Sequence, residues 1–405
     1  MPIHASEKTV IEKPMEGQSY LLPLILVTSL FFLWGLAYGL LDVLNKHFQE
    51  TLNITKQRST LLQAAYFGAY FLMAIPAGIF MNKVGYKKGI ITGLLLYAMG
   101  AFLFYPSATF SSFNLFLFSL FILASGLTFL ETAANPYITV LGKPETSAFR
   151  LNLSQSFNGV GSFIGPIIGA QLFFGSQTSN LDSVKMVYII IGSVVLGIAF
   201  LFLRTYLPEI KEQESMKKSQ PVHKNLFQHS HFLWAVVAQF FYVAAQVGMA
   251  ALFINYCTEK NLGITNENAS YLLSGSLLLF TIGRFAGTVL MRVVKPNQLL
   301  SIYSVANILL CAAVIYLPGI ISVYSLMAAF FFASIMFPTI FALGVKDLGL
   351  HTKRGASFII MSIVGGAIVP YVMASFTSTA MAYTVPLICF VVVFLFGVKG
   401  YKVRA

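Results

Sequence analysis

The sequence predicts an all-α integral membrane protein with twelve transmembrane helices arranged as two six-helix bundles. Of its 405 residues, 57% are hydrophobic and only 10% are charged, whereas an ordinary soluble domain has about 25% charged residues. Three stretches, 89–130, 296–345 and 355–398, contain no Asp, Glu, Lys or Arg. A bilayer core needs about 20 apolar residues per helix, so each stretch accommodates two helices joined by a short turn. These observations exclude a soluble enzyme and an intrinsically disordered chain.

Other apolar segments of spanning length bring the predicted spans to twelve. Pro106-Ser107 and Pro318-Gly319 mark turns between neighbouring spans. The segments are too long for barrel strands and lack their strict alternation. The predicted spans cover about 21–45, 60–82, 88–107, 113–142, 149–174, 184–204, 231–257, 269–292, 298–317, 322–345, 355–378 and 381–400.

The distribution of Lys and Arg predicts the orientation. With both termini in the cytoplasm, the inside segments hold 20 of the 26 basic residues, the outside segments hold five, and Arg284 lies within a span. This asymmetry explains the net charge of +12 without a nucleic-acid partner. The first 19 residues are polar, and no small-residue cleavage site follows the first apolar run. We therefore expect no cleaved signal peptide.

A charged segment at 205–230 divides the spans into two sets of six. Residues 136–142 (PYITVLG) and 338–344 (PTIFALG) share the pattern P-x-I-x-x-L-G at equivalent points of the two sets. Two such halves around a central site are a transporter architecture. We expect a cytoplasmic tail at 1–20, a bundle at 21–204, a cytoplasmic linker at 205–230, a second bundle at 231–400 and a cytoplasmic tail at 401–405.

Two carboxylates fall within the predicted spans, and both are candidate functional groups. A charged acid at the bilayer centre costs about 2.5–3.5 kcal/mol even on insertion scales, so such residues usually face a polar interior and carry function. Glu131 has no charged neighbour between 89 and 142 and is the stronger candidate for a proton carrier. Its alternative is a protonated acid bonded to a neighbouring helix. Asp42 lies late in the first span, and its alternative is an interfacial acid at the exit of that span.

Amide and aromatic residues within the spans predict a sugar site. Sugars need donors and acceptors around the ring edge and a flat apolar surface against the C–H face, and amides with Trp and Tyr supply both. Each amide alone is more often a contact between helices. Gln239, Tyr242 and Gln246 share one helical face at i, i+3 and i+7. The other candidates are Trp34, Asn135, Gln155 and Asn158.

Other chemistry has little support in the sequence. Cys257, Cys311 and Cys389 lie in apolar stretches and are typical of small buried side chains. The six His lie in tails, loops or span ends, and no metal-binding, P-loop or nucleophile-elbow motif occurs. We therefore expect no enzyme, no metal and no cofactor. Arg284 is expected to have a structural role, paired with a helix end or a carboxylate.

The loop after the second predicted span resembles the signature loop of the major facilitator superfamily, G-x-x-x-D-R-x-G-R-R. Here it reads Gly78, Asn82, Lys83, Gly85 and Lys87, with an amide in place of the acid and Lys in place of Arg. In that family the loop latches the two halves at the cytoplasmic face. The alternative is an ordinary basic turn on the inner side of the membrane.

Longer segments resemble the fucose permease branch of this superfamily, the fucose–galactose–glucose–proton symporters. The strongest is GLTFLETAANPYITVLGKPETSAFRLNLSQSFNGVGSFIGP at 126–166. Others are FLWGLAYGLLDVLNKHFQ (32–49), GIITGLLLYAMGAFLF (89–104), QFFYVAAQ (239–246), TIGRFAGT (281–288) and FPTIFALGVKDLG (337–349). The resemblance implies the major facilitator fold in a bacterial inner membrane.

The resemblance also implies roles for individual residues. Asp42 and Glu131 match acids tied to proton-coupled sugar transport, and Glu131 would contact both proton and sugar. Asn158 matches an Asn that helps to recognise the sugar, and Trp34 matches a Trp at the site. A departure occurs at 38–41, where YGLL replaces the Asn-rich segment of fucose permeases. This departure leaves the identity of the sugar open, because relatives carry glucose, galactose, mannose or N-acetylglucosamine.

The sequence thus predicts a monomeric secondary transporter that imports a neutral monosaccharide with a proton, with L-fucose as the first choice. Its partners would be the sugar, the proton and the lipid bilayer. A sodium-coupled hexose symporter is the alternative in mechanism, and a sugar sensor that does not transport is the alternative in class.

Overall fold

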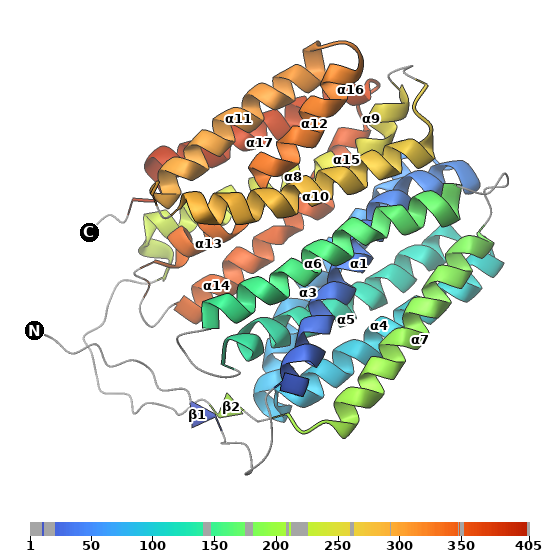
Figure 1. Ribbon diagram of the computed structural model, residues 1–405, viewed down its shortest axis with the longest axis vertical. Helices are drawn as coiled ribbons and strands as arrows, with labels where there is room; N and C mark the ends of the chain where they lie inside the picture. The colour runs from blue at the N-terminus through green and yellow to red at the C-terminus, as the bar shows by residue number, and fades with distance from the viewer. Residues whose placement is uncertain are drawn as a thin grey trace, which may run out of the picture.

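The computed structural model describes residues 10–11, 21–140, 147–174, 181–207, 210–211, 226–259, 263–291, 293–346, 348 and 352–402, which are almost entirely helical (Figure 1). The helices that run in the first half are α1 (Leu21–Thr51), α2 (Lys56–Ser59), α3 (Leu61–Val84), α4 (Tyr86–Thr109), α5 (Phe113–Val140), α6 (Ser147–Gly169) and α7 (Asp182–Arg204). Those of the second half are α8 (Ser230–Ala251), α9 (Phe253–Glu259), α10 (Asn266–Leu290), α11 (Pro296–Tyr316), α12 (Gly319–Ala333), α13 (Met336–Val345), α14 (Thr352–Met361), α15 (Gly365–Ala374), α16 (Thr379–Ala382) and α17 (Thr384–Leu395). Two-residue strands, β1 (Val10–Ile11) and β2 (Ile210–Lys211), pair antiparallel.

These helices correspond to the twelve predicted spans. Within the described residues, eleven helical segments are long and apolar enough to cross a membrane, and a twelfth apolar segment, Phe358–Ala374, is shorter. The all-α membrane fold is therefore confirmed. The first span was placed too short, because α1 continues from the predicted end at residue 45 to Thr51. Polar residues extend this helix because they bond to the other half of the molecule, as described below.

Several spans of the second half are interrupted. The seventh span breaks at Leu252, between α8 and α9, and the tenth breaks between α12 and α13. The eleventh consists of α14, a 3₁₀ turn at Ser362–Val364 and α15. At the break in the tenth span, the Tyr242 hydroxyl donates to the Ala333 carbonyl at 3.0 Å. A side chain thus satisfies a backbone group at the end of a helix inside the bilayer, where no water can do so.

The helices form two packed groups, which appear as blue to green and yellow to red in Figure 1. In the first group α4 packs on α5 and α7, α1 on α6, and α3 on α5. In the second, α11 packs on α12 and α17, while α8 packs on α13, α15 and α17. We call these groups the N half and the C half. They meet chiefly where α6 packs on α10 and where α3 packs on α15.

Glycines bring α1 and α6 into backbone contact. A Cβ atom added at Gly35 would lie 2.0 Å from the Asn158 carbonyl oxygen, and one at Gly165 would lie 2.8 Å from the Gly39 Cα. Gly39 and Gly161 face the opposite helix equally closely. Small residues at four-residue spacing allow this approach in membranes, where dispersion contacts replace the hydrophobic effect as the force between helices. The pairing fixes the position of α1, which carries Trp34 and Asp42.

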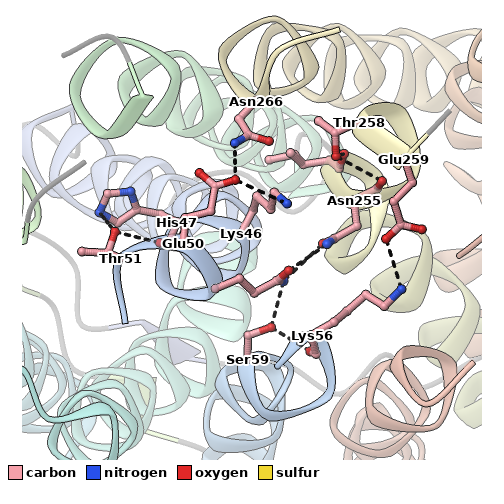
Figure 2. A network of polar contacts seen from close by, with 12 residues as sticks. Lys46, His47, Glu50, Thr51, Lys56, Ser59, Asn255, Thr258, Glu259 and Asn266 are labelled. Atoms are coloured by element: carbon pink, nitrogen blue, oxygen red, sulfur yellow. Dashed lines mark hydrogen bonds and ion pairs between the residues drawn. The ribbon is translucent and has the colours of Figure 1, made fainter. Parts of the chain in front are cut away.

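Polar side chains join the two halves at the end of the molecule where α1 finishes (Figure 2). The Gln49 and Asn255 amides bond to each other in both directions, at 2.7 and 3.2 Å. Gln49 also donates to the Ser59 hydroxyl at 2.9 Å, and Asn45 donates to the Ala251 carbonyl at 2.9 Å. These contacts tie α1 to α8 and α9, across the boundary between the halves.

Charged side chains surround the amide pair. Lys56 lies 3.2 Å from a Glu259 carboxylate oxygen and donates to the Thr379 hydroxyl at 2.6 Å, while Asn266 donates to the Glu50 carboxylate. Figure 2 shows the Lys56–Glu259 ion pair and the Asn266–Glu50 bond beside the labelled Asn255 and Ser59. We call this set the inter-half network, with members Asn45, Gln49, Glu50, Lys56, Ser59, Asn255, Glu259, Asn266 and Thr379. It joins the N half to the C half at this end.

Substitution of Gly165 by Ala should destabilise the protein, because the added methyl group collides with the backbone of α1. Overpacking of this kind costs about 1–3 kcal/mol. The midpoint of thermal unfolding, measured on detergent-solubilised protein, should fall. Gly197→Ala on α7 is the matched control, since nothing lies within 4 Å of an added Cβ there. Equal midpoints for the two variants would contradict the backbone contact between α1 and α6.

Candidate functional site

Glu131 lies on α5 inside the N half. Its side chain is half-buried, and its Oε2 atom is fully buried without a hydrogen-bond partner. The Tyr70 side chain on α3 lies within electrostatic range of the carboxyl group. A buried, unpartnered carboxylate oxygen is costly, so a proton or a ligand donor is expected to meet it in the functional cycle.

Asp42 lies on α1 and is only 1% exposed. The Gln63 amide of α3 donates to its Oδ1 atom at 3.3 Å, whereas Asp42 Oδ2 and Gln63 Oε1 are buried without partners. Asp42 is therefore enclosed by protein and bonded to α3, and the alternative of an interfacial acid at the exit of the first span stays open. Asp42 interacts with Gln63 and Tyr38, and Glu131 interacts with Tyr66 and Tyr70.

A series of tyrosines connects these acids to the C half. Tyr66 and Tyr70 of α3 stack with ring centroids 5.4 Å apart and interplanar angle 29°. Tyr38 of α1 lies within electrostatic range of Tyr66 and of Tyr242 on α8. Tyr242 in turn lies within electrostatic range of Arg284 on α10. Polar groups therefore run from Glu131 in the N half to Arg284 in the C half.

Several of these groups have buried polar atoms that no described residue satisfies. Such atoms are rare in native proteins, and each one calls for an explanation such as a ligand. They occur on α1, α3, α5, α8 and α10, and both halves contribute. The side chains concerned include Asp42, Gln63, Tyr66, Tyr70, Glu131, Gln239 and Arg284.

The three residues predicted to share one face of α8 differ in their surroundings. Gln239 is fully buried, with both amide atoms unpartnered, so it remains a candidate for sugar contact. Gln246 is partly exposed. Tyr242 uses its hydroxyl hydrogen on the Ala333 carbonyl. Its hydroxyl can still accept a hydrogen bond, but its primary contact supports the interrupted tenth span.

The predicted residues of the N half lie near one another on α1 and α6. Asn158 donates to the Phe31 carbonyl at 3.3 Å, a long bond that a better acceptor can replace. Trp34 is half-buried and packs against Phe31 with ring centroids 6.4 Å apart. Gln155 is half-buried on α6. The side chain of Asn135 lies outside the described residues.

Arg284 differs from its expected environment. Its guanidinium Cζ lies 5.0 Å from the Phe280 ring centroid, and its Nε atom is buried without a partner. Among the described residues, the three ion pairs do not include Arg284, so the expected pairing with a carboxylate is not seen there. A cation over an aromatic face is stabilised modestly, and its N–H groups stay available to a ligand.

The signature loop forms a tight turn between α3 and α4. Gly85 has φ +88°, a conformation that side-chain-bearing residues rarely adopt, which explains glycine at this position. Lys87 donates to the Leu203 and Thr205 carbonyls at 3.2 and 2.8 Å, so its contacts stay within the N half at the end of α7. Gly78 and Lys83 lie on α3, and the Asn82 side chain lies outside the described residues.

The sequence reasoning missed four residues of this site: Tyr38, Gln63, Tyr66 and Tyr70. Their helical spacing was an available signal, because Tyr38 lies one turn before Asp42 and Tyr66 lies one turn before Tyr70. No cluster of three or more His, Cys, Asp or Glu with metal-binding geometry occurs among the described residues. The three cysteines are free and buried, as expected.

Comparisons with known proteins agree with this architecture. The chain is 39% identical to the L-fucose-proton symporter of Escherichia coli, over 97% of this chain and 96% of that protein. It is 34% identical to a glucose/galactose transporter of Brucella abortus, over 95% of both chains.

Solved structures of transporters also match this chain along most of its length. The crystal structure of the major facilitator transporter FucP in the outward conformation matches with a TM-score of 0.71 and 39% identity, over 94% of this chain and 99% of that one. A D-xylose-proton symporter matches with a TM-score of 0.75 at 14% identity, which shows the fold alone. The profile of the Major Facilitator Superfamily matches residues 27–370. This multi-pass membrane protein therefore belongs to the major facilitator superfamily.

Proposed function

We propose that the protein is a proton-coupled monosaccharide symporter of the bacterial inner membrane. The observation that carries the proposal is the buried, unpartnered Oε2 atom of Glu131, which lies at the N-half end of a series of hydroxyl, amide and guanidinium groups that reaches the C half. Two relatives with 34–39% identity are named as sugar transporters, which supports the same function.

The chemistry of these groups suits a neutral sugar. Hydroxyls and amides both donate and accept, as sugar hydroxyls do, while Trp34 and the stacked pair Tyr66–Tyr70 supply flat aromatic surface. Each buried polar atom left unsatisfied costs about 1–3 kcal/mol. A sugar between the halves would remove several such costs at once. L-fucose is our first choice of substrate, with glucose and galactose next.

Glu131 would carry the proton. A bare carboxylate closed inside the protein, away from water, is strongly unfavourable, while a neutral carboxyl group can be closed there at much smaller cost. Protonation of Glu131 and sugar binding would therefore both favour closure around the substrate. The proton gradient then drives accumulation of the sugar by alternating access, as one half rocks against the other.

The excess of basic residues in one set of loops supports cytoplasmic termini. In that orientation the inter-half network lies at the external face. The network joins α1 and α2 to α9, α10 and α16, so it must open before a sugar can enter from outside.

Sodium coupling is the second candidate. Asp42 Oδ2 on α1 and Gln63 Oε1 on α3 are buried oxygens, and neither has a hydrogen-bond partner. Oxygen pairs of this kind can help to ligate a hard cation. Uptake of labelled sugar at fixed pH, with and without sodium, separates the two coupling ions.

The proposed function predicts acidification of liposomes that contain the purified protein. Pyranine inside the liposomes should report a fall in internal pH when L-fucose, glucose, galactose, mannose or N-acetylglucosamine is added without sodium. The Glu131→Gln variant should still exchange labelled sugar for unlabelled sugar, because Gln keeps the shape and polar groups. It should lose uphill accumulation, because it cannot take up a proton.

Glu267→Gln is the matched control, since Glu267 lies in the first turn of α10, outside the site. It should accumulate sugar as the unmodified protein does. If the Glu131→Gln variant accumulates sugar normally, Glu131 is not the proton carrier. If no sugar changes the internal pH, but labelled sugar is taken up once sodium is supplied, the coupling ion is sodium rather than the proton.

A cross-link across the inter-half network should stop uptake. The residues Gln49 and Asn255 can be replaced by cysteine in a background where the three native cysteines are replaced by alanine. A short, reducible bifunctional thiol reagent would then bridge α1 and α9 in the closed state and prevent external loading. We expect uptake to fall to the level of empty liposomes and to recover after reduction. The single variants Gln49→Cys and Asn255→Cys should be insensitive to the reagent, and unimpaired uptake by the bridged protein would show that the network need not open.

A further inference from the structure

Four buried tyrosines among the described residues use their hydroxyl groups to support the backbone. Tyr97 donates to the Leu33 carbonyl at 3.2 Å, Tyr256 to Val314 at 2.7 Å and Tyr383 to Met249 at 3.3 Å. Tyr242 makes the same kind of bond to Ala333. This pattern is expected inside a bilayer, where a carbonyl at a helix break or junction has no water to bond.

Tyr66 and Tyr70 depart from that pattern. Both side chains are buried, at 1% and 5% exposure, and neither hydroxyl makes a hydrogen bond of good geometry, although the Tyr70 hydroxyl faces both Tyr66 and Glu131. They lie one turn apart on α3, so their rings stack on the same face of the helix. A buried hydroxyl without a good hydrogen bond costs about 1–3 kcal/mol, so two adjacent ones call for a partner that the described residues do not supply at good geometry.

The surroundings of the pair indicate what the hydroxyls meet. Both tyrosines lie within electrostatic range of Glu131, whose Oε2 atom is also buried without a partner. Trp34 lies beside Tyr66. An aromatic surface, two neutral donor–acceptor groups and a carboxyl group thus converge from α1, α3 and α5. Polar edges around flat aromatic faces are the chemistry that recognises a sugar ring.

We propose that Tyr66 and Tyr70 are specificity-determining residues, whose hydroxyls bond to hydroxyl groups of the sugar that also contacts Glu131. This inference rests on the proposed function and deepens it, because it assigns sugar recognition to α3. A site that bonds a substrate hydroxyl rejects an analogue without it, since the protein group is then left unpaired. These two tyrosines would therefore decide which epimers and deoxy sugars are accepted.

The test compares Tyr66→Phe and Tyr70→Phe with the unmodified protein in liposomes. Half-saturation of sugar exchange is measured for the accepted sugar and for each of its monodeoxy analogues. Exchange needs no proton gradient, so the readout does not depend on proton coupling. In each Phe variant, the concentration of the parent sugar that gives half-maximal exchange should rise about ten-fold. This is the effect of losing one good hydrogen bond. One monodeoxy analogue lacks the hydroxyl group to which that tyrosine bonds. For this analogue, the half-saturating concentration should be nearly the same in the variant and in the unmodified protein.

Tyr97→Phe is the control for a structural tyrosine, because its hydroxyl supports the α1 backbone. It should affect the parent sugar and all analogues equally, if at all. Tyr70→Phe keeps the inference testable if Tyr66→Phe is poorly folded, and gel filtration in detergent identifies such a variant.

The possible failures are distinguishable. Unmodified protein that exchanges no sugar overturns the proposed function. Sugar exchange by the unmodified protein, with half-saturation unchanged in both Phe variants, overturns the inference alone. An equal loss for the parent sugar and every monodeoxy analogue also overturns it, because that result describes a structural role.

Discussion

Every polar group inside a bilayer must find its partner within the protein or in a ligand, and the arrangement between the two halves depends on this constraint. Most buried hydroxyls in the described residues meet it locally, by donating to a carbonyl on the same or a neighbouring helix. The exceptions lie mainly on α1, α3, α8 and α10, which contact the opposite half, and on α5, which carries Glu131. The unsatisfied groups are therefore better explained by a ligand than by imperfect packing, which would scatter them through both bundles.

Helix α1 links the site to the closure of the molecule. Its glycine face, at Gly35 and Gly39, is fixed against α6 by backbone contact. A different face carries polar and aromatic residues at intervals of three or four: Trp34, Tyr38, Asp42, Asn45 and Gln49. The first three belong to the site, and the last two belong to the inter-half network. Because one rigid helix carries both, a movement that breaks the network also moves the site residues relative to the C half. Under the proposed function, occupancy of the candidate site and opening of this end would therefore be connected through α1.

The fold was predictable because its signals are local and repetitive. Charge-free stretches of spanning length and the placement of Lys and Arg need no knowledge of tertiary contacts, and the twelve spans follow from them. The site was only partly predictable. Glu131 and Asp42 stand out because an acid in an apolar run is conspicuous. Tyr66 and Tyr70 do not stand out in a chain with 19 Tyr, because only the structure distinguishes a hydroxyl that bonds a backbone carbonyl from one that faces Glu131 without a good hydrogen bond. The polar end of α1 was missed for a related reason, since its partners lie some 200 residues away in the sequence, as in the bond between Asn45 and Ala251 at a separation of 206.

The two kinds of group in the site have different consequences for coupling. The tyrosine hydroxyls and the Gln239 amide are neutral, so a neutral sugar can satisfy them completely. The carboxylate of Glu131 is different, because sugar hydroxyls alone leave its charge inside the closed protein, at a cost that a few hydrogen bonds offset only in part. Sugar binding can therefore satisfy the hydroxyls without permitting closure, and protonation can neutralise the acid without satisfying the hydroxyls. Only the two together remove both penalties, and under the proposed function this combined requirement would couple the movement of the proton to that of the sugar.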